Sequence, residues 1–384
     1  MKYDSFVTAM WNAVKSGHVD GIKAQFIQNA LQYGVEGGTR REQLAGHRVF
    51  SNYPAATGEF ATKVAKAIAK RVQTGRTLDL GPWSEELRGV MKKVFKWFYI
   101  FPLSARAKPL EPDDARPISD HTRTGFNAAV DLTGLTHTLD AVHEIESLLK
   151  PGYCMHVSDV DAAYPMLAWA SWIWAAMFHR FYPMNEDGSL GSELHLYVNI
   201  NGDFGTRGMP GVFKIFFTDV VVNMARAYGV LSLPMPIFVD DMGAIGALAK
   251  AARKEMLRFQ EWTSATCGVN FKQIKDRHAS QVQLMLGFWW DSFAGTRSLE
   301  ERRLHSYLEM LWDYSSRRTL SLNERQSIAG KMQRAAMTMP PGAACLLAGL
   351  FGLMGGLKWG WQKRRTTREE RQNYYRITGT FMTS

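Results

Sequence analysis

Apolar residues recur at helical spacing over several long stretches of the chain. In residues 58–76 the pattern runs to Gly75, and glycine is a residue type that commonly ends helices. The stretch 84–101 opens with Ser84, a helix-capping residue, and glutamates follow it in the first turn. Both stretches therefore predict helices. Further helices are predicted within 1–36 and at 137–149, 210–230, 250–268 and 299–339.

Other stretches have the pattern of strands and tight turns. Residues 235–248 predict a strand, a short polar tip and a second strand, and 102–127 has the Pro- and Asp-rich composition of a loop and hairpin. Because strands and helices are mixed, with hairpins in place of strict strand–helix–strand repetition, we expect an α+β core followed by a helical module. Single strands are predicted at 153–160, 194–200 and 281–292.

The charge of the chain changes this picture by suggesting a partner. The 384 residues are 46% hydrophobic and 21% charged, which is an ordinary globular composition, and the formal net charge is +10. An excess of basic residues favours a polyanionic partner, although a basic protein without a nucleic-acid role is an equal alternative on charge alone. The cysteines are Cys154, Cys267 and Cys345, without the spacing of a zinc site or a disulfide framework.

Two segments bear on targeting and membranes. The N-terminal residues lack a long apolar core, so we expect no signal peptide and an intracellular protein, cytoplasmic or nuclear rather than secreted. Residues 335–357 carry no charge and are long enough to span a bilayer. Prolines and glycines interrupt this segment, so a buried or interface helix is the better interpretation and no membrane partner is expected.

The candidate chemistry centres on an aspartate pair inside an apolar run. Asp240 and Asp241 lie at the predicted polar tip in "IFVDDM", and Asp159 and Asp161 end the predicted strand 153–160. Carboxylates are the ligands that magnesium prefers, and carboxylates from two neighbouring strands can hold the two metal ions of nucleotidyl transfer. An aspartate pair by itself is more often a turn or surface feature. The order of the motifs around it therefore decides whether a catalytic role is indicated.

The surrounding segments are, in order along the chain, "ARPISD" (115–120), "DVDAAY" (159–164), "FGTRGMPGVFK" (204–214), "FVDDM" (238–242), "VNFKQIKD" (269–276) and "LMLGFWWDS" (284–292). That order resembles the reverse-transcriptase family over about residues 50–340, where these segments match the fingers motif and motifs A, B, C, D and E in turn. Within the family, the "FG" that opens the segment at 204 and the stretches flanking the core are most similar to retrotransposon enzymes of the tyrosine-recombinase (DIRS-like) type.

The resemblance implies the fold of a right hand, with fingers, an antiparallel palm sheet backed by helices, and a helical thumb. We expect no ribonuclease H domain in this chain, because too few residues follow the thumb, and no recombinase segment; both are possible partner domains. The implied segments are 1–49 as an N-terminal helical extension, 50–131 and 178–207 as fingers, 132–177 and 208–298 as palm, 299–340 as thumb and 341–384 as a connection-like segment.

The resemblance also implies site residues and partners. The implied reaction is RNA-directed DNA synthesis with two Mg²⁺ ions, for which Mn²⁺ is a substitute, on RNA and DNA template–primers with dNTPs. Lys275 is the implied acid for the leaving pyrophosphate, with Lys272 as the alternative, and Tyr164 is the implied steric gate against a ribose 2′-hydroxyl. The other implied residues are Asp159, Asp240, Asp241 and Val160 for metal, Lys108, Arg116, Phe204 and Gly208 for the nucleotide, and Leu286, Gly287 and Phe288 for the primer grip.

Departures from the family pattern leave two rival functions open. Phe204 stands where retroviral enzymes have Gln, so a polar contact from that side chain is lost. An RNA-dependent RNA polymerase would share the palm and its aspartates, but Tyr164 and the apolar residue before the aspartate pair weigh against it. A nucleic-acid-binding relic without activity is the second rival. The intact aspartates weigh against it, because buried carboxylates without metal only destabilise a fold. The basic stretch 363–376 could bind phosphates through its charges and stack its tyrosines on bases, although such a run is more often simply solvated.

Overall fold

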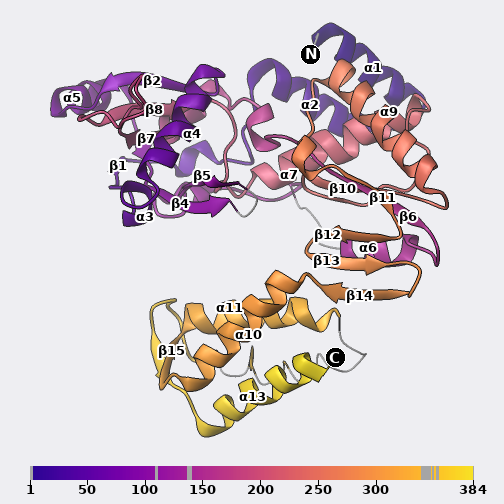
Figure 1. Ribbon diagram of the computed structural model, residues 1–384. Helices are drawn as coiled ribbons and strands as arrows, with labels where there is room; N and C mark the ends of the chain where they lie inside the picture. Colours follow the sequence, from indigo (N-terminus) through magenta and orange to yellow (C-terminus); the bar gives the residue numbers. More distant parts are fainter. Residues whose placement is uncertain are drawn as a thin grey trace. The chain divides into compact units, whose positions relative to one another are not determined.

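The computed structural model of the chain divides into two compact units (Figure 1). Unit 1 comprises Met1–Ile145, Ser158–Ala244 and Ala251–Asp276, and unit 2 comprises Glu146–Val157, Ile245–Lys250 and Arg277–Ser384. The residues that the structure describes are 3–108, 111–135, 141–338, 347, 350–351 and 354–383, and the side chains of 108, 111–113, 375 and 378–383 lie outside that description.

Unit 1 is built around an apolar core covered by the N-terminal helices. Phe6 and Ile27, from the first two helices, are fully buried in this core with Phe216 and Phe217. The Asp20 side chain caps the second helix by accepting a hydrogen bond from the Lys23 N–H at 3.0 Å. The α-helices of unit 1 are α1 (Tyr3–Lys15), α2 (Gly21–Tyr33), α3 (Pro54–Thr57), α4 (Ala61–Gln73), α5 (Glu85–Val94), α7 (Met209–Phe213) and α8 (Asn223–Ala227), and α6 (Ala141–Leu148) and α9 (Ala249–Cys267) each have residues in both units.

A five-stranded mixed sheet and a hairpin form the second part of unit 1. The predicted helix 84–101 is confirmed over α5, where Ser84 accepts from the Leu87 N–H, but its last residues form a strand because Phe98–Ile100 are buried and pair with two neighbours. The hairpin predicted within 102–127 is present, and α4 packs against its second strand. The sheet has the order β1 (His47–Val49), β3 (Phe98–Ile100), β7 (Phe178–Phe181), β8 (His195–Asn199), β2 (Thr77–Pro82), and the hairpin is β4 (Leu103–Lys108) with β5 (Glu111–Ser119).

A four-stranded sheet carries the predicted aspartates. Its order is β11-β6-β10-β9, and strands β6 and β10 each have residues in both units. The strand predicted at 153–160 is present as β6, and every residue of it is buried. The predicted strand–tip–strand is confirmed, with Asp241 opposite Phe238 across a two-residue turn. The strands are β6 (Cys154–Asp159), β9 (Ile237–Phe238), β10 (Asp241–Gly246) and β11 (Arg277–Ser280).

The helix predicted at 210–230 is present as one continuous helical run in three parts. It begins with α7, continues through the π-helical segment η5 (Lys214–Val222) and ends with α8. Short 3₁₀ helices connect other parts of unit 1. They are η1 (Arg41–Gln43), η2 (Phe126–Ala129), η3 (Tyr164–Met166), η4 (Ser171–Ala176) and η6 (Gln273–Lys275).

Unit 2 corrects two predictions. The single strand predicted at 281–292 is a hairpin, because Leu286 and Gly287 both have positive φ and form a two-residue turn. The helical stretch predicted at 299–339 is interrupted by a short strand before Ser321, which caps the next helix in a capping box with Glu324. The elements are β12 (Val282–Met285), β13 (Phe288–Asp291), β14 (Thr296–Leu299), α10 (Glu301–Ser316), β15 (Thr319–Ser321), α11 (Leu322–Ala336), β16 (Lys363–Arg365) and α13 (Arg368–Thr383).

The uncharged segment 335–357 falls largely outside the described residues. Among the helices that the structure does describe, none is long and apolar enough to cross a membrane.

Candidate metal and nucleotide site

Three carboxylates converge where β6 meets the β9–β10 turn. Asp159 ends β6 and is 3% exposed, Asp240 occupies the turn, and Asp241 opens β10. One carboxylate oxygen from each lies within 4.8 Å of the others. The Val160 N–H donates to the Asp240 carbonyl at 2.9 Å, which fixes the end of β6 against the turn. The structure therefore brings together two aspartates that lie far apart in the sequence.

The turn that presents Asp240 is strained. Val239 has a φ of +60°, a conformation that β-branched residues almost never adopt. Within the described residues, the other non-glycine residues with positive φ are Ala162 and Leu286, which lie in the segments matched to motifs A and E. Strain of this kind persists where the surrounding structure holds it, and it clusters at functional sites.

The neighbouring carboxylates make the charged forms of Asp240 and Asp241 less favourable. Burial and the charge of Asp159 raise the pKa of Asp240, against the opposing effects of Lys275 and Arg116. Burial, the charge of Asp240 and a hydrogen bond to Asp159 raise the pKa of Asp241 to about 7. A cluster whose carboxylates hold protons this tightly favours a cation among them.

Lys275 supplies one positive charge to this cluster. Its ammonium donates to the Asp159 carboxylate and lies 4.0 Å from Asp241 Oδ1. Burial lowers the pKa of Lys275, but the hydrogen bond to Asp159 and the charges of the three aspartates outweigh burial and raise it. Lys272 contributes its backbone N–H, which donates to the Asp159 carbonyl at 2.9 Å.

The donor set fits a hard divalent cation. Carboxylate oxygens are the ligands that Mg²⁺ uses in proteins, usually one or two of them with substrate oxygens completing the shell. Val160 is buried and its side chain is apolar, so only its backbone carbonyl is available as a ligand. Asp159, Asp240 and Asp241 are therefore the residues that could hold the metal, with Val160 in a supporting position.

Three of the predicted nucleotide residues contact one another beside the carboxylates, in a group that we call the stack although its two rings are tilted by 53°. The Phe204 ring lies 4.9 Å from the Tyr164 ring, between ring centroids, and the Arg116 guanidinium lies 5.0 Å from the Phe204 centroid. Tyr164 is 9% exposed and also packs edge-on against Phe213. Burial and the nearby charge of Asp240 raise the pKa of the Tyr164 hydroxyl, so it stays neutral at physiological pH. The result is an aromatic pair, Tyr164 and Phe204, with the Arg116 guanidinium over the Phe204 ring.

A cleft of about 210 Å³ is lined by Asp159, Asp240, Arg116 and Phe204, and also by cations that sequence reasoning missed. Lys70, Arg71 and Arg76 come from the end of α4 and the turn after it, and they face the same cleft as Arg116 and Lys275. The sequence shows them only as basic residues near a helix C-terminus, where cations are common. Five or more cations around a carboxylate cluster suit an anionic, metal-binding ligand.

The remaining predicted residues differ in their environment. Gly208 is needed for packing, because a Cβ there would overlap the Gly37 carbonyl, and the structure gives it no contact of its own with the cleft. The side chain of Lys108 lies outside the described residues. In unit 2, Arg334 donates to the Leu286 carbonyl and lies 4.9 Å from the Phe288 centroid, so the turn at Leu286–Gly287 is held from α11.

One of the two tyrosines of the basic C-terminal stretch, Tyr374, is buried and is not available to stack on bases. Tyr374 is 1% exposed, and its hydroxyl donates to Glu370 at 2.8 Å. Glu370 in turn pairs with the buried Arg325 of α11. This side chain is a structural anchor of α13, and Tyr375 lies outside the described side chains.

Comparisons with known proteins identify the fold. The chain is similar to the foamy viral protease-reverse transcriptase dRH in complex with double-stranded DNA, with 15% identity, a TM-score of 0.57, and coverage of 99% of this chain and 60% of that chain. It is also similar to the foamy viral protease-reverse transcriptase in complex with RNA/DNA hybrid, with 13% identity, a TM-score of 0.60, and coverage of 100% and 46%. A third structure, with double-stranded DNA, has 14% identity, a TM-score of 0.54, and coverage of 98% and 71%.

These similarities confirm the predicted α+β fold of the reverse-transcriptase type. The chain spans 60% and 46% of the length of the first two structures. No family model and no curated protein matches the chain.

Proposed function

We propose that the protein is an RNA-directed DNA polymerase of a retroelement, of the tyrosine-recombinase (DIRS-like) type. The observation that carries this proposal is the convergence of Asp159, Asp240 and Asp241, because the first two of these carboxylates line a cleft that is also lined by cations. A nucleoside triphosphate with its metal ions matches both the charge and the ligand preference of such a cleft. RNA and DNA template–primers and dNTPs are the proposed partners.

The proposed reaction adds one deoxynucleotide to a primer. The primer 3′-hydroxyl loses its proton and attacks the α-phosphorus, a new P–O bond forms, and the bond to the β-phosphate breaks to release pyrophosphate. Two Mg²⁺ ions held by the aspartates would supply Lewis-acid stabilisation of the attacking and leaving oxygens. Lys275 donates a proton to the leaving pyrophosphate, a role that suits an ammonium held beside the metal ligands.

The stack beside the carboxylates would select and hold the nucleotide. Arg116 offers a planar fork of donors for phosphate oxygens, and its place over Phe204 orients it. Tyr164 lies with its ring against Phe204, where it would occupy the space that a ribose 2′-hydroxyl needs. Phe204 therefore contributes an apolar floor in place of a polar contact.

Primer extension tests the proposed reaction directly. With an RNA template, a DNA primer and Mg²⁺, we expect extension with dNTPs and none with NTPs, because the Tyr164 ring excludes the 2′-hydroxyl. Chelation of the metal by EDTA should stop the reaction. Extension with NTPs alone would instead identify an RNA polymerase, and extension with neither would contradict a polymerase.

Metal affinity should depend on pH in a defined direction. Asp241 must lose its proton to bind Mg²⁺, and its pKa in the metal-free protein is about 7. We expect the Mg²⁺ dissociation constant, measured by calorimetry, to rise roughly tenfold per pH unit below 7 and to level off above it.

The raised pKa of Asp241 also predicts that the metal-free protein becomes less stable as the pH rises, whereas Mg²⁺ binding becomes tighter. Because the folded pKa lies above the ordinary value for Asp, the protonated carboxyl stabilises the folded state, and this stabilisation disappears as the pH rises to about 7. Mg²⁺ should therefore raise the melting temperature more at pH 8 than at pH 6. An equal increase at both pH values would contradict the assignment of the metal to this cluster.

A further inference from the structure

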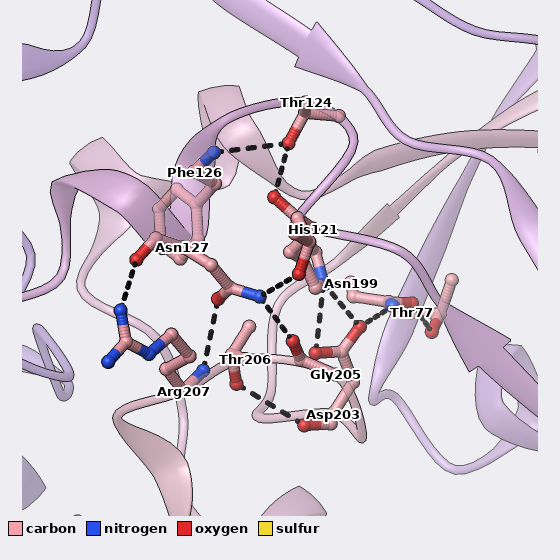
Figure 2. Close-up of polar contacts among 11 residues, drawn as sticks. Thr77, His121, Thr124, Phe126, Asn127, Asn199, Asp203, Gly205, Thr206 and Arg207 are labelled. Carbon is pink, nitrogen blue, oxygen red and sulfur yellow. Dashed lines mark hydrogen bonds and ion pairs between the residues drawn. The ribbon is translucent and has the colours of Figure 1, made fainter. Parts of the chain in front are cut away.

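A buried histidine–aspartate pair lies behind the turn at residues 203–207, which we call the motif B turn. His121 and Asp203 are 0% and 2% exposed, and His121 Nε2 lies 3.2 and 3.1 Å from the two carboxylate oxygens (Figure 2). Burial raises the pKa of Asp203, but the charge of His121, hydrogen bonds from His121 and Ser119, and the charge of Arg71 outweigh burial and lower it. Neither residue has a part in the reaction proposed above, and a buried charge is retained at considerable energetic cost.

The Asp203 side of the pair ties the motif B turn to the five-stranded sheet. Asn199, the last residue of β8, donates to Asp203 Oδ2 at 3.0 Å. The Asn199 side chain also accepts from the Thr77 hydroxyl of β2 at 2.8 Å, so two strands hold the carboxylate (Figure 2). Within the turn, the Thr206 hydroxyl donates to the Asp203 carbonyl at 3.4 Å.

The His121 side ties the same turn to the segment after the β4–β5 hairpin. The Asn127 side chain donates to the Gly205 carbonyl at 2.8 Å and accepts from the Arg207 N–H at 3.0 Å (Figure 2). The Asn127 N–H donates to the His121 carbonyl at 3.3 Å. Gly205 has a φ of +123°, and a Cβ there would overlap the Ser119 carbonyl, so the turn lies flat against the end of β5.

Phe204 lies between the two residues that these hydrogen bonds hold, Asp203 and Gly205. Its carbonyl accepts from the Ser119 N–H at 3.4 Å, and its ring contacts both the Tyr164 ring and the Arg116 guanidinium. The backbone of Phe204 is therefore held from β5, while its neighbours Asp203 and Gly205 are held from the sheet and from Asn127. Any shift of the motif B turn would move the Phe204 ring of the stack.

We propose that the His121–Asp203 pair positions Phe204 and thereby sets how tightly, and with which sugar, the site binds its nucleotide. The proposal rests on the proposed function, since it assigns the pair a role in the same nucleotide site. His121 and Asp203 are positioning residues: they act through Phe204 and touch no reacting atom. A side chain that supports a binding surface needs to hold it to within a fraction of an ångström, which a buried, doubly tethered carboxylate does.

The test uses the full chain with His121→Gln, Asp203→Asn and the double variant. Gln keeps an amide donor near the position of Nε2, and Asn keeps the shape of the carboxylate, so both variants retain hydrogen bonding in the buried site. We expect the KM for dNTPs to rise roughly tenfold with kcat changed by less than about threefold. The preference for dNTPs over NTPs should fall in the same variants, and the double variant should resemble the single ones because the pair acts as a unit.

The described residues offer a matched control in a second histidine–aspartate pair. His195 Nδ1 of β8 lies 3.0 Å from Asp79 Oδ2 of β2, but this pair is partly exposed and lies outside the motif B turn. His195→Gln should leave KM and sugar preference unchanged. Variants at His121 and Asp203 that lower the melting temperature while leaving KM and sugar preference at wild-type values would overturn the proposal and leave a structural role only.

Direct binding separates this proposal from the proposed function. Calorimetry with Mg²⁺ and either dATP or ATP measures nucleotide affinity and sugar preference without synthesis. Wild-type binding that is preferential for dATP and is lost in His121→Gln and Asp203→Asn would support the positioning role even if no primer were extended, in which case only the polymerase function would fail. Absence of nucleotide binding by the wild-type protein would overturn both.

Discussion

Asp240→Asn should abolish DNA synthesis while making the metal-free protein more stable. The substitution keeps the shape of the side chain but removes a charged oxygen ligand, so we expect kcat to fall by a factor on the order of 10³ or more. The pKa of Asp240 is raised by burial and by the charge of Asp159, which means that its charge opposes folding at neutral pH. Without metal at pH 8, the melting temperature should rise by roughly 1–4 °C.

The matched control for this prediction is Asp187→Asn. Asp187 is an exposed carboxylate of unit 1 whose pKa is lowered by hydrogen bonds from Ser189, so its charge favours the folded state. This variant should keep full activity and gain no stability. Primer extension on both variants tests the loss of DNA synthesis, and thermal unfolding on both variants tests the gain in stability. An active Asp240→Asn, or one that melts several degrees below wild type, would contradict the assignment.

Replacing Tyr164 by Val should admit ribonucleotides. The Tyr164 ring lies against Phe204 and Phe213, and removing it opens the space that a 2′-hydroxyl requires. We expect the ratio of kcat/KM for dNTPs over NTPs to fall by about 10²-fold, which corresponds to about 2–3 kcal/mol of lost discrimination. The smaller side chain also leaves a cavity, so the melting temperature should fall as well.

Tyr164→Phe distinguishes the ring from its hydroxyl. Phe keeps the stack with Phe204 and loses only a buried hydroxyl, so this variant should retain the sugar preference of the wild-type protein. Single-nucleotide incorporation kinetics with matched dNTP and NTP pairs provide the measurement. A preference lost in Tyr164→Phe would assign the selection to the hydroxyl, and a preference kept in Tyr164→Val would place the gate elsewhere.

Local patterns in the sequence were sufficient for most of the elements and for the carboxylate cluster. The strand that ends at Asp159 is visible as a β-like pattern, and the turn that contains Asp240 follows an apolar run that stops at the aspartates. The structure places the two together. The turn at Leu286–Gly287 was missed because the apolar run continues across it, and only the backbone shows that the chain reverses there.

The residues that surround and support the site could not be predicted from the sequence. His121 and Asp203 belong to segments 82 positions apart, and nothing in either segment indicates that one faces the other. Lys70 and Arg71 appear as ordinary helical surface residues until the fold brings α4 to the cleft. Contacts between distant segments depend on how the elements pack, which periodicity along one chain does not encode.

The close approach at Gly208 determines how much of the chain is needed for folding. With no Cβ, Gly208 lies directly against the Gly37 carbonyl, and Gly211 lies in the same way against the Leu135 carbonyl. Helices α1 and α2 share their apolar core with the helical run that begins at Met209. A shortened chain that starts after residue 49 would lack α1 and α2 and would expose the apolar face of that run to water. We therefore expect that the smallest fragment able to fold and present the aspartates retains the first two helices and the glycines that follow them.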